Sequence, residues 1–482
     1  MLLSKKFLTL KKYRTAPTSV KRKPDDTIFI RSNGGSMTTT ENEQKLWHLN
    51  GNWTPMLEEI TANDLKVEGN IPEELSGTYL RVGPNPSSGW SPHWFFGDGM
   101  LHGISLENGK ALWYKNRFVE TRVYKGEAGD DPMAVMGDLT MGTANTHVVR
   151  HAGKILALEE GHFPYELTPE LETVGPWDFD GKLNTSMTAH PKICPETGEM
   201  MFFSYFNFEA PYLNYHRVNA DGELVQSEGI DIPNIVMMHD FNITRNHTIF
   251  MDLPLTFNLE AIDESGLPFR FDPEAGARLG VMKRNGDNNS ISWLEIDPCY
   301  VFHPVNAHEE GENIIIHVSR LESAFANSAD DYSSQGHLWK WTIDTTTGKV
   351  SEEQIDDKAC DFGRVDDRLV GLPARFGYVM SLPENKESVE YGESLYKYDF
   401  LTGERLEHKF GSGVIGGEPV FAPSSPDSEE DQGWVMCLVH DENTNSSKFI
   451  IVDAQDFESD PVATIHIPQR VPYGAHGSWM PN

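Results

Sequence analysis

Short hydrophobic runs, separated by polar turns, recur along the chain from about residue 47. The runs are rich in β-branched and aromatic side chains, which favour strands over helices. Gly, Pro, Asn and Asp separate them, and "HAGK", "ADGE" and "TTTGK" have the form of hairpin tips. Long amphipathic helical patterns are scarce, so the pattern predicts an all-β protein. The clearest runs are "THVVRHAGKILALEE", "GEMMFFSYFNF", "HTIFMDLPLTF", "NIIIHVSR", "HLWKWTID", "ARFGYVMSL", "GWVMCLVHD" and "KFIIVDAQ".

No Pro- or Ser-rich linker divides residues 44–482, which we interpret as a single domain. This body is too long for one sandwich and suits radial repetition, in which each propeller blade is a four-stranded sheet. Seven blades would take about 62 residues each. No sequence repeat marks the blades, so periodicity alone supports a propeller only weakly.

The first residues of the chain differ sharply in charge from the rest. "MLLSKKFLTLKKYRTAPTSVKRKP" contains eight Lys or Arg and no acid, and Leu3, Phe7 and Leu10 have the spacing of a short amphipathic helix. We expect residues 1–43 to be a basic, disordered extension. Three interpretations compete: a transit-type peptide, a membrane-surface helix, or upstream sequence before a second start at Met37. We expect a cytoplasmic protein with membrane contact, or organelle import if the extension is a transit peptide.

Overall charge and cysteine content exclude several classes of protein. The net charge is −33, which argues against binding to nucleic acid, because a phosphate backbone requires a basic face. The four cysteines are widely spaced and form no CxxC pair, so we expect neither a disulfide framework nor a thiolate metal site. No apolar run is long enough for a transmembrane helix.

Four of the eighteen histidines share one setting. His190 in "SMTAHPK", His239 in "VMMHDF", His303 in "VFHPVNAHEE" and His476 in "PYGAHGSW" each lie at the end of a strand-like run, beside a turn. Their separations correspond to about one, one and three blades, so in a propeller the four rings could meet on the axis. Four imidazoles suit Fe, Zn, Cu or Ni, and an octahedral ion would keep two open positions.

Metal-bound histidines need a partner on the other ring nitrogen, and carboxylates often supply it. Three acids at strand-like edges fit this requirement: Glu160 in "LALEEGHFP", Asp361 in "ACDFGRVDDR" and Glu418 in "GGEPVFAP". An isolated acid of this kind would otherwise be a surface residue.

With these residues in view, the chain resembles the carotenoid cleavage oxygenases. These non-heme iron enzymes include apocarotenoid oxygenases, stilbene-cleaving oxygenases and a retinoid isomerase. The matching motifs run through nearly the whole body: "GTYLRVGPNP", "HWFFGDGMLHGI", "YKNRFVETRVY", "TANTHVVRHAGKILALEEGHFPYEL", "DFDGKLNTSMTAHPK", "MMHDFNIT", "FHPVNAHEE", "EPVFAP" and "VPYGAHGSW". The resemblance implies a seven-bladed β-propeller with a helical or loop cap over an axial iron site.

The resemblance also implies roles for single residues. Fe(II) would be held by His190, His239, His303 and His476. Glu160 would support His239, Asp361 would support His303, and Glu418 would support His476.

Two positions need comment. Family members usually carry Glu where Asp361 stands, and the shorter side chain implies either a strand shifted inward or a bridging water. Thr146 in "TANTH" occupies a position where the family places a small side chain near one open iron site, and its methyl group would restrict which ligands bind there.

The implied reaction is O₂-dependent cleavage of a conjugated C=C bond into two carbonyl products. Stilbene-cleaving members resemble one another in a Lys and a Tyr that contact the phenol, where this chain has Glu159 and Phe118. We therefore expect a carotenoid or apocarotenoid, a lipophilic polyene, with Phe118 and Trp94 lining its tunnel. A polyene lives in lipid, so we expect peripheral membrane contact, with "MDLPLTFNLEAI" as a candidate segment.

Three alternatives remain open at this point. The chain could cleave stilbenes or lignin phenols, it could be an isomerase that uses the same iron, or it could be a metal-free binding propeller. A metal-free binding propeller would have no need of four matched histidines.

Overall fold

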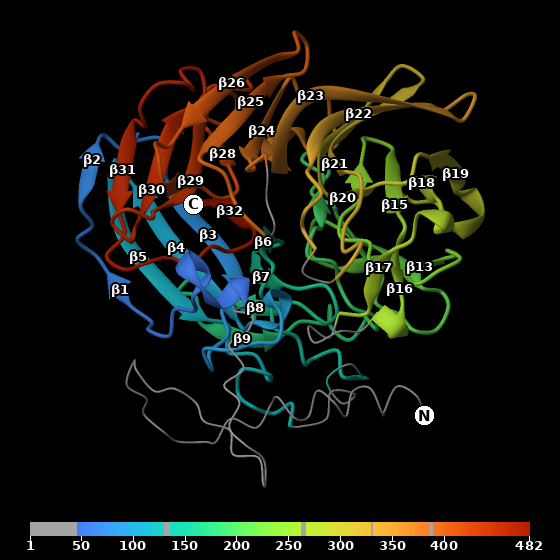
Figure 1. Ribbon diagram of the computed structural model, residues 1–482, viewed down its shortest axis with the longest axis horizontal. Helices are drawn as coiled ribbons and strands as arrows, with labels where there is room; N and C mark the ends of the chain where they lie inside the picture. Colours follow the sequence, from blue (N-terminus) through green and yellow to red (C-terminus); the bar gives the residue numbers. More distant parts are fainter. Residues whose placement is uncertain (1–45, 130–134, 136, 262–266, 329–330, 385–388) are drawn as a thin grey trace, which may run out of the picture.

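The structure is a computed structural model that describes residues 46–129, 135, 137–261, 267–328, 331–384 and 389–482 (Figure 1). The predicted basic extension, residues 1–43, lies outside the described residues. The elements with defined bounds are strands and short 3₁₀ helices, which confirms the prediction of an all-β protein. The helices are η1 (Trp47–Leu49), η2 (Gly51–Trp53), η3 (Trp94–Phe96), η4 (Leu259–Ala261), η5 (Pro273–Ala275), η6 (Asn288–Ser290) and η7 (Asp367–Leu369). Within these described ranges, no helix is long and apolar enough to span a membrane.

Except for β2, the strands of the first half form four antiparallel sheets in chain order, and β32 from the end of the chain joins the first of them. Sheet 1 contains β1 (Thr61–Ala62), β5 (Lys110–Phe118), β4 (Gly99–Glu107), β3 (Gly77–Pro84) and β32 (Gly477–Pro481). Sheet 2 contains β6 (His147–His151), β7 (Lys154–Leu158), β8 (Tyr165–Leu167) and β9 (Thr173–Pro176). Sheet 3 contains β10 (Lys192–Ile193), β11 (Met200–Ser204), β12 (Leu213–Val218) and β13 (Leu224–Ile230). Sheet 4 contains β14 (Asn242–Ile243), β15 (His247–Asp252), β18 (Ala277–Lys283) and β19 (Ser292–Ile296), and the hairpin of β16 (Leu255–Phe257) and β17 (Phe269–Phe271) is inserted in it.

The second half continues the pattern, with one long strand shared between two sheets. Sheet 5 contains β20 (Tyr300–Glu310), β21 (Asn313–Leu321), β22 (His337–Asp344) and the first part of β23 (Lys349–Arg364). Sheet 6 contains the second part of β23, β24 (Phe376–Ser381), β25 (Ser394–Asp399) and β26 (Glu404–Lys409). Sheet 7 contains β27 (Val414–Ile415), β28 (Val420–Pro423), β29 (Gly433–Asp441), β30 (Ser446–Asp453), β31 (Ala463–His466) and β2 (Val67–Gly69).

Adjacent residues of the inner strands face different hydrophobic cores. Val148 of β6 packs between sheets 1 and 2, whereas Val149 packs between sheets 2 and 3. Tyr79 of β3 packs against sheet 7, whereas Leu80 packs against sheet 2. Because successive side chains of a strand point to opposite faces, a sheet buried on both faces needs continuous rather than alternating apolar runs. This explains runs such as "VMCLV" in β29.

The sheets pack on one another in chain order, and the last packs on the first. Shared clusters join sheets 3, 4 and 5, sheets 5 and 6, and sheets 6 and 7. Sheets 7 and 1 meet where Phe449 lies against Tyr79, with ring centroids 4.8 Å apart. Figure 1 shows the sheets arranged around a common centre, with β1, near the start of the described chain, and β32, at its end, in the same sheet.

The predicted hairpin tips are confirmed. In "HAGK", β6 and β7 pair from His151 to Lys154, and Ala152 and Gly153 both have positive φ, as a two-residue turn requires. Gly222 and Gly348 take the same left-handed conformation in the other two tips.

Strand pairing also explains how the end of the chain is held. β32 pairs with β3 from Gly77 opposite Pro481 to Arg81 opposite Gly477. The backbone N–H of His476 donates to the Thr146 carbonyl at 3.0 Å, and the His476 carbonyl accepts from Val82 at 3.1 Å. The terminus is therefore an integral strand, and His476 is fixed at its inner end.

Candidate metal centre

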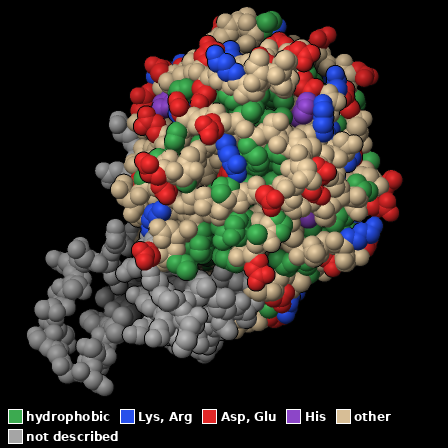
Figure 2. Space-filling model, turned by 90° about the vertical axis from the view of Figure 1, so that its right-hand side faces the viewer, with side chains coloured by type: hydrophobic (Ala, Val, Ile, Leu, Met, Phe, Trp, Pro, Cys, Tyr) green, Lys and Arg blue, Asp and Glu red, His purple; other side chains and the backbone are tan. Residues whose placement is uncertain are grey.

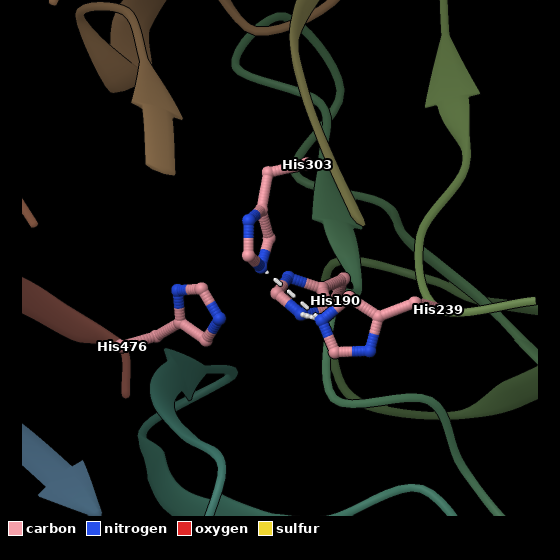
Figure 3. A group of neighbouring side chains, drawn as sticks. All are labelled: His190, His239, His303 and His476. Atoms are coloured by element: carbon pink, nitrogen blue, oxygen red, sulfur yellow. Dashed lines mark hydrogen bonds between the residues drawn. The ribbon is translucent and has the colours of Figure 1, made fainter. Parts of the chain in front are cut away.

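Four histidine side chains converge from separate sheets (Figure 3). His190 precedes β10, His239 precedes β14, His303 lies in β20, and His476 precedes β32. All four are buried, and one ring nitrogen from each lies within 4.8 Å of the other three. β10, β14, β20 and β32 are all edge strands, so each of these four sheets contributes a side chain from one edge.

Each predicted carboxylate lies next to one of these rings. Asp361 of β23 accepts from Nδ1 of His303 at 3.0 Å, and Glu418 accepts from Nδ1 of His476 at 2.9 Å. Glu160, just after β7, is in direct ion-pair contact with Nδ1 of His239. The structure therefore brings together the pairs that the sequence suggested.

The carboxylates are themselves held by further donors. Tyr205 donates its hydroxyl hydrogen to Glu160. Glu418 accepts from the Gly477 N–H at 2.8 Å and lies 3.3 Å from the Arg364 guanidinium. Such outer contacts fix the orientation of the carboxylate and thereby of the ring that it supports.

Asp361 reaches its histidine directly, because the strand bulges inward. The register of β23 against β24 shifts between Asp361 and Arg364, and Phe362 between them has φ of 57°. Gly363 follows, where a Cβ atom would lie 2.5 Å from a methyl carbon of Val305. Of the two expected explanations for the shorter acid, the structure shows the shifted strand.

Thr146 lies beside the centre at the start of sheet 2. Its hydroxyl donates to the Asn145 side-chain oxygen at 3.0 Å, and its carbonyl holds His476. The structure thus gives Thr146 a contact with the backbone of one of the four histidines.

A fourth carboxylate near the rings was missed by the sequence analysis. Asp240 follows His239 directly, is buried, and lies 3.5 Å from Nδ1 of His190. Lys192 binds both of its oxygens, at 2.8 and 3.0 Å. The adjacency of an acid and a histidine in "MMHDF" was the only sequence signal for this contact.

Burial and these charges shift the pKa values at the centre. Burial lowers the pKa of His190 and His476 well below the ordinary histidine value. Burial would also lower the pKa of His239, but the adjacent Glu160 carboxylate outweighs burial and the pKa is raised. Despite burial, His476 and Arg364 hold the pKa of Glu418 well below its usual range. Glu418 is therefore an anion at any physiological pH.

The nitrogens that face one another imply a positive charge between them. Nδ1 of His239 and of His303 each face a carboxylate and so carry their protons there, which leaves lone pairs on both Nε2 atoms. These two Nε2 atoms are only 3.2 Å apart, and Nε2 of His190 lies 3.0 Å from that of His239. Lone pairs this close repel unless a proton or a metal cation lies among them.

The net charge around the rings favours a dication. The charged side chains in contact with the rings or their carboxylates are Glu160, Asp240, Asp361, Glu418, Lys192 and Arg364. Four negative and two positive charges leave −2, which one divalent cation neutralises. Imidazole is a good ligand for Fe(II), Zn(II), Cu(II) and Ni(II), so these residues fit a transition metal.

Two different environments adjoin the centre. A cavity of about 530 Å³ is lined by His190, His303 and His476 and by the charged side chains of Lys192, Asp240, Arg364 and Asp367. Away from this cavity lining, aromatic rings contact the histidines. Phe302 lies 5.6 Å from the His239 ring, and Phe362 lies 4.6 Å from the His303 ring, centroid to centroid.

The residues predicted to line a tunnel lie in different places. Trp94 joins the aromatic side, because it packs on Trp53, which contacts Tyr391, which in turn contacts Phe362. Phe118, by contrast, stacks on Tyr124, with centroids 5.1 Å apart.

Glu159, which stands where stilbene-cleaving members carry Lys, is half-buried and paired with His162.

Comparison with known proteins identifies the family. The family model for the retinal pigment epithelial membrane protein matches residues 53–481. A carotenoid cleavage oxygenase of Mycobacterium tuberculosis is 37% identical over 502 residues, covering 92% of this chain and all of that protein. This chain belongs to the carotenoid cleavage oxygenase family. The predicted family is confirmed, and the protein is an oxygenase.

Further matches support this oxygenase assignment. A carotenoid 9,10(9′,10′)-cleavage dioxygenase of Pisum sativum is 37% identical, covering 90% of this chain and 89% of that enzyme. The crystal structure of a lignostilbene dioxygenase of Pseudomonas brassicacearum superposes with a TM-score of 0.82 at 28% identity. That match covers 90% of this chain and 98% of the other.

Proposed function

We propose that this oxygenase uses Fe(II) to cleave one conjugated C=C bond of a carotenoid or apocarotenoid. The observation that carries the proposal is the buried four-histidine centre with aromatic rings against it. His190, His239, His303 and His476 would hold the ion through Nε2. Glu160, Asp361 and Glu418 would keep the opposite ring nitrogens protonated and the rings oriented.

We further propose that sheets 1 to 7 are the blades of one seven-bladed β-propeller. Their order in the chain and the packing of sheet 7 on sheet 1 support this assignment. The cap would consist of loops with η1, η2 and η3, since their tryptophans pack together above Tyr391 and Phe362.

The ion, when bound, would supply the activation of O₂. The protein's own residues perform the remaining tasks. Phe302 and Phe362 provide an apolar wall on which a polyene can lie without water. Thr146, whose backbone carbonyl accepts from the N–H of His476, would limit access to one open position through its methyl group. One O₂ adds one oxygen atom to each alkene carbon as the C=C bond breaks, so the two carbonyl products account for both atoms and no external reductant is required.

Two observations favour a polyene over a phenolic stilbene. Glu159 is an acid paired with His162, and it would repel a phenolate rather than bind it. Phe118 has no hydroxyl group with which to bind a phenol. The 28% identity to a lignostilbene dioxygenase keeps stilbene cleavage as the second candidate, and an isomerase reaction at the same centre as the third.

We also propose peripheral contact with a membrane, from which the polyene would enter. Aromatic side chains gather around the inserted hairpin. Phe208 is 41% exposed and contacts Phe257, while Phe206 contacts Phe269. Figure 2 shows hydrophobic side chains gathered in the lower part of this face. Such a patch on a protein of net charge −33 suits insertion between neutral lipids rather than binding to an anionic surface.

The function is tested by turnover under ¹⁸O₂ with a panel of carotenoids, apocarotenals and stilbenes, with products identified by mass spectrometry. We expect two carbonyl products from a polyene, with one ¹⁸O atom in each before exchange with water. Products only from stilbenes would establish the second candidate. Isomerised product without label would establish the third.

A further inference from the structure

His190 is the one histidine of the four for which the sequence suggested no carboxylate. The other three are each supported at Nδ1 by Glu160, Asp361 or Glu418. A neutral imidazole ring without such support can bind with either nitrogen and can rotate more freely. The centre therefore requires something to fix His190.

Asp240 occupies the corresponding place. Its carboxylate lies 3.5 Å from Nδ1 of His190, on the side of the ring away from Nε2. At this separation the contact is electrostatic, and it favours the tautomer whose Nδ1–H faces the acid. That tautomer leaves the Nε2 lone pair directed at the other three histidines.

Asp240 is held in this position from two directions. The Phe241 N–H donates to Oδ1 at 2.6 Å, and Lys192 lies 2.8 Å from the same oxygen and 3.0 Å from Oδ2. Asp240 is only 2% exposed, so a free carboxylate there would be costly without these partners. Lys192 is two residues from His190 at the start of β10, so one short segment carries both the ring and the clamp of its acid.

The arrangement resembles that of Glu418, which lines the same cavity. Glu418 supports His476 and is held by a backbone N–H and by Arg364. Asp240 likewise has a backbone N–H and a basic side chain. Both basic residues line the same cavity.

We propose that Asp240, clamped by Lys192, is the positioning carboxylate of His190 and completes a set of four carboxylates behind four histidines. The proposal rests on the divalent-metal centre of the proposed function, but not on the substrate. Removing the charge of Asp240 weakens metal binding at His190, and removing Lys192 weakens it through Asp240.

The test is titration of the metal-free full-length protein with Co(II), which takes imidazole ligands and reports its ligand field by absorption. For Asp240→Asn we expect roughly 10–100-fold weaker binding, the usual effect of a lost outer partner, with a shifted absorption band. Lys192→Met should change the Co(II) affinity and the absorption band in the same direction as Asp240→Asn, but by a smaller amount. Asp240→Glu, which restores the charge, should recover part of the affinity.

Glu309→Gln is the matched control. Glu309 supports His247 at 2.7 Å in the same manner, but it lies six residues along β20 from His303. Its loss should lower the melting temperature without changing Co(II) affinity or absorption. Melting curves of the metal-free variants show whether each one folds.

The outcomes separate this inference from the proposed function. If the wild type binds Co(II) and the Asp240→Asn variant binds it with the same affinity and absorption, the role of Asp240 is overturned and the proposed function is not. Absence of Co(II) binding by the wild type would overturn both. Weakened binding by Asp240→Asn supports the positioning role even if no polyene is cleaved.

Discussion

On one side of the four histidines lies a cavity with charged walls, formed by Lys192, Asp240 and Arg364. On the other, the rings of Phe302 and Phe362 lie directly against imidazoles. A single bulge in β23 serves both sides, since Phe362 turns to the aromatic side while Arg364, two residues on, lines the cavity. Charges can thus tune the centre from one side while the other stays dry enough for an apolar substrate.

The largest effect is expected where the two sides meet. His303 lines the cavity and also stacks near Phe362. Replacing it in His303→Ala should remove a ligand rather than a support, and so reduce activity by more than the roughly 10–100-fold expected of an outer partner. Metal content by mass spectrometry and product formation measure both effects. A variant with full metal content and activity would exclude His303 from the centre.

The next effect concerns the charged side. In Glu418→Gln the amide oxygen still accepts from His476, but the half-buried Arg364 loses one of its two carboxylate partners and keeps only the exposed Asp367, at 3.2 Å. We expect roughly 10–100-fold weaker metal affinity, measured by titration. Glu166→Gln, which breaks an ion pair with Lys154 in sheet 2, is a control that should leave the affinity unchanged. Equal losses in both variants would mean that the charge of Glu418 has no special role.

A change on the aromatic side should affect substrate rather than metal. Phe362→Ala removes apolar contact area worth about 1–2 kcal/mol, so kcat/KM for a polyene should fall roughly 5–30-fold. Metal affinity should stay within about twofold, because no charge or ligand is changed. Phe376→Ala on β24, also half-buried but outside the centre, controls for general destabilisation. If Phe362→Ala lost metal affinity without a change in kcat/KM, the aromatic side would serve metal binding rather than substrate binding, contrary to this assignment.

The residues on these two sides also show which parts of the site could be predicted from the sequence. The four histidines were recognisable because each follows an apolar run and precedes a turn, and the motifs around them are those of the family. The acids Glu160, Asp361 and Glu418 were recognisable from the same motifs. Asp240 and Lys192 were not. An acid next to His239 and a lysine two residues after His190 are patterns too common to predict a contact, and only the fold of sheets 3 and 4 brings these side chains together.

The local backbone geometry could not be predicted from the sequence either. Whether Asp361 could replace a longer acid depended on the positive φ of Phe362 and on the close approach of Gly363 to Val305. Neither follows from hydrophobic periodicity. The placement of Phe118 against Tyr124 rather than among the rings beside the centre also depends on tertiary packing.

The smallest expected effect is on stability, and it distinguishes a structural histidine within a sheet from the four histidines that converge on the centre. His216 of β12 is 1% exposed, bonds to Thr185 and Ser227 at 2.9 Å each, and burial lowers its pKa to about 4. In the unfolded chain its pKa is about 6.5, so below that pH the unfolded state takes up a proton first. Stability from His216 is therefore present at pH 7 and is lost as the pH falls from about 6.5 towards 4, with about 1–2 kcal/mol lost by pH 5.

Denaturant unfolding of the metal-free protein at pH 7 and pH 5 measures the fall in the free energy of unfolding between these pH values. In His216→Gln this fall should be smaller by the contribution of His216, about 1–2 kcal/mol. With Co(II) added, the fall should be steeper, because protons then compete with the metal for the rings of the centre. His216→Gln should leave that additional metal-dependent part unchanged. If the substitution instead removed the metal-dependent part, His216 would be coupled to the centre, and the distinction between structural and converging histidines would fail.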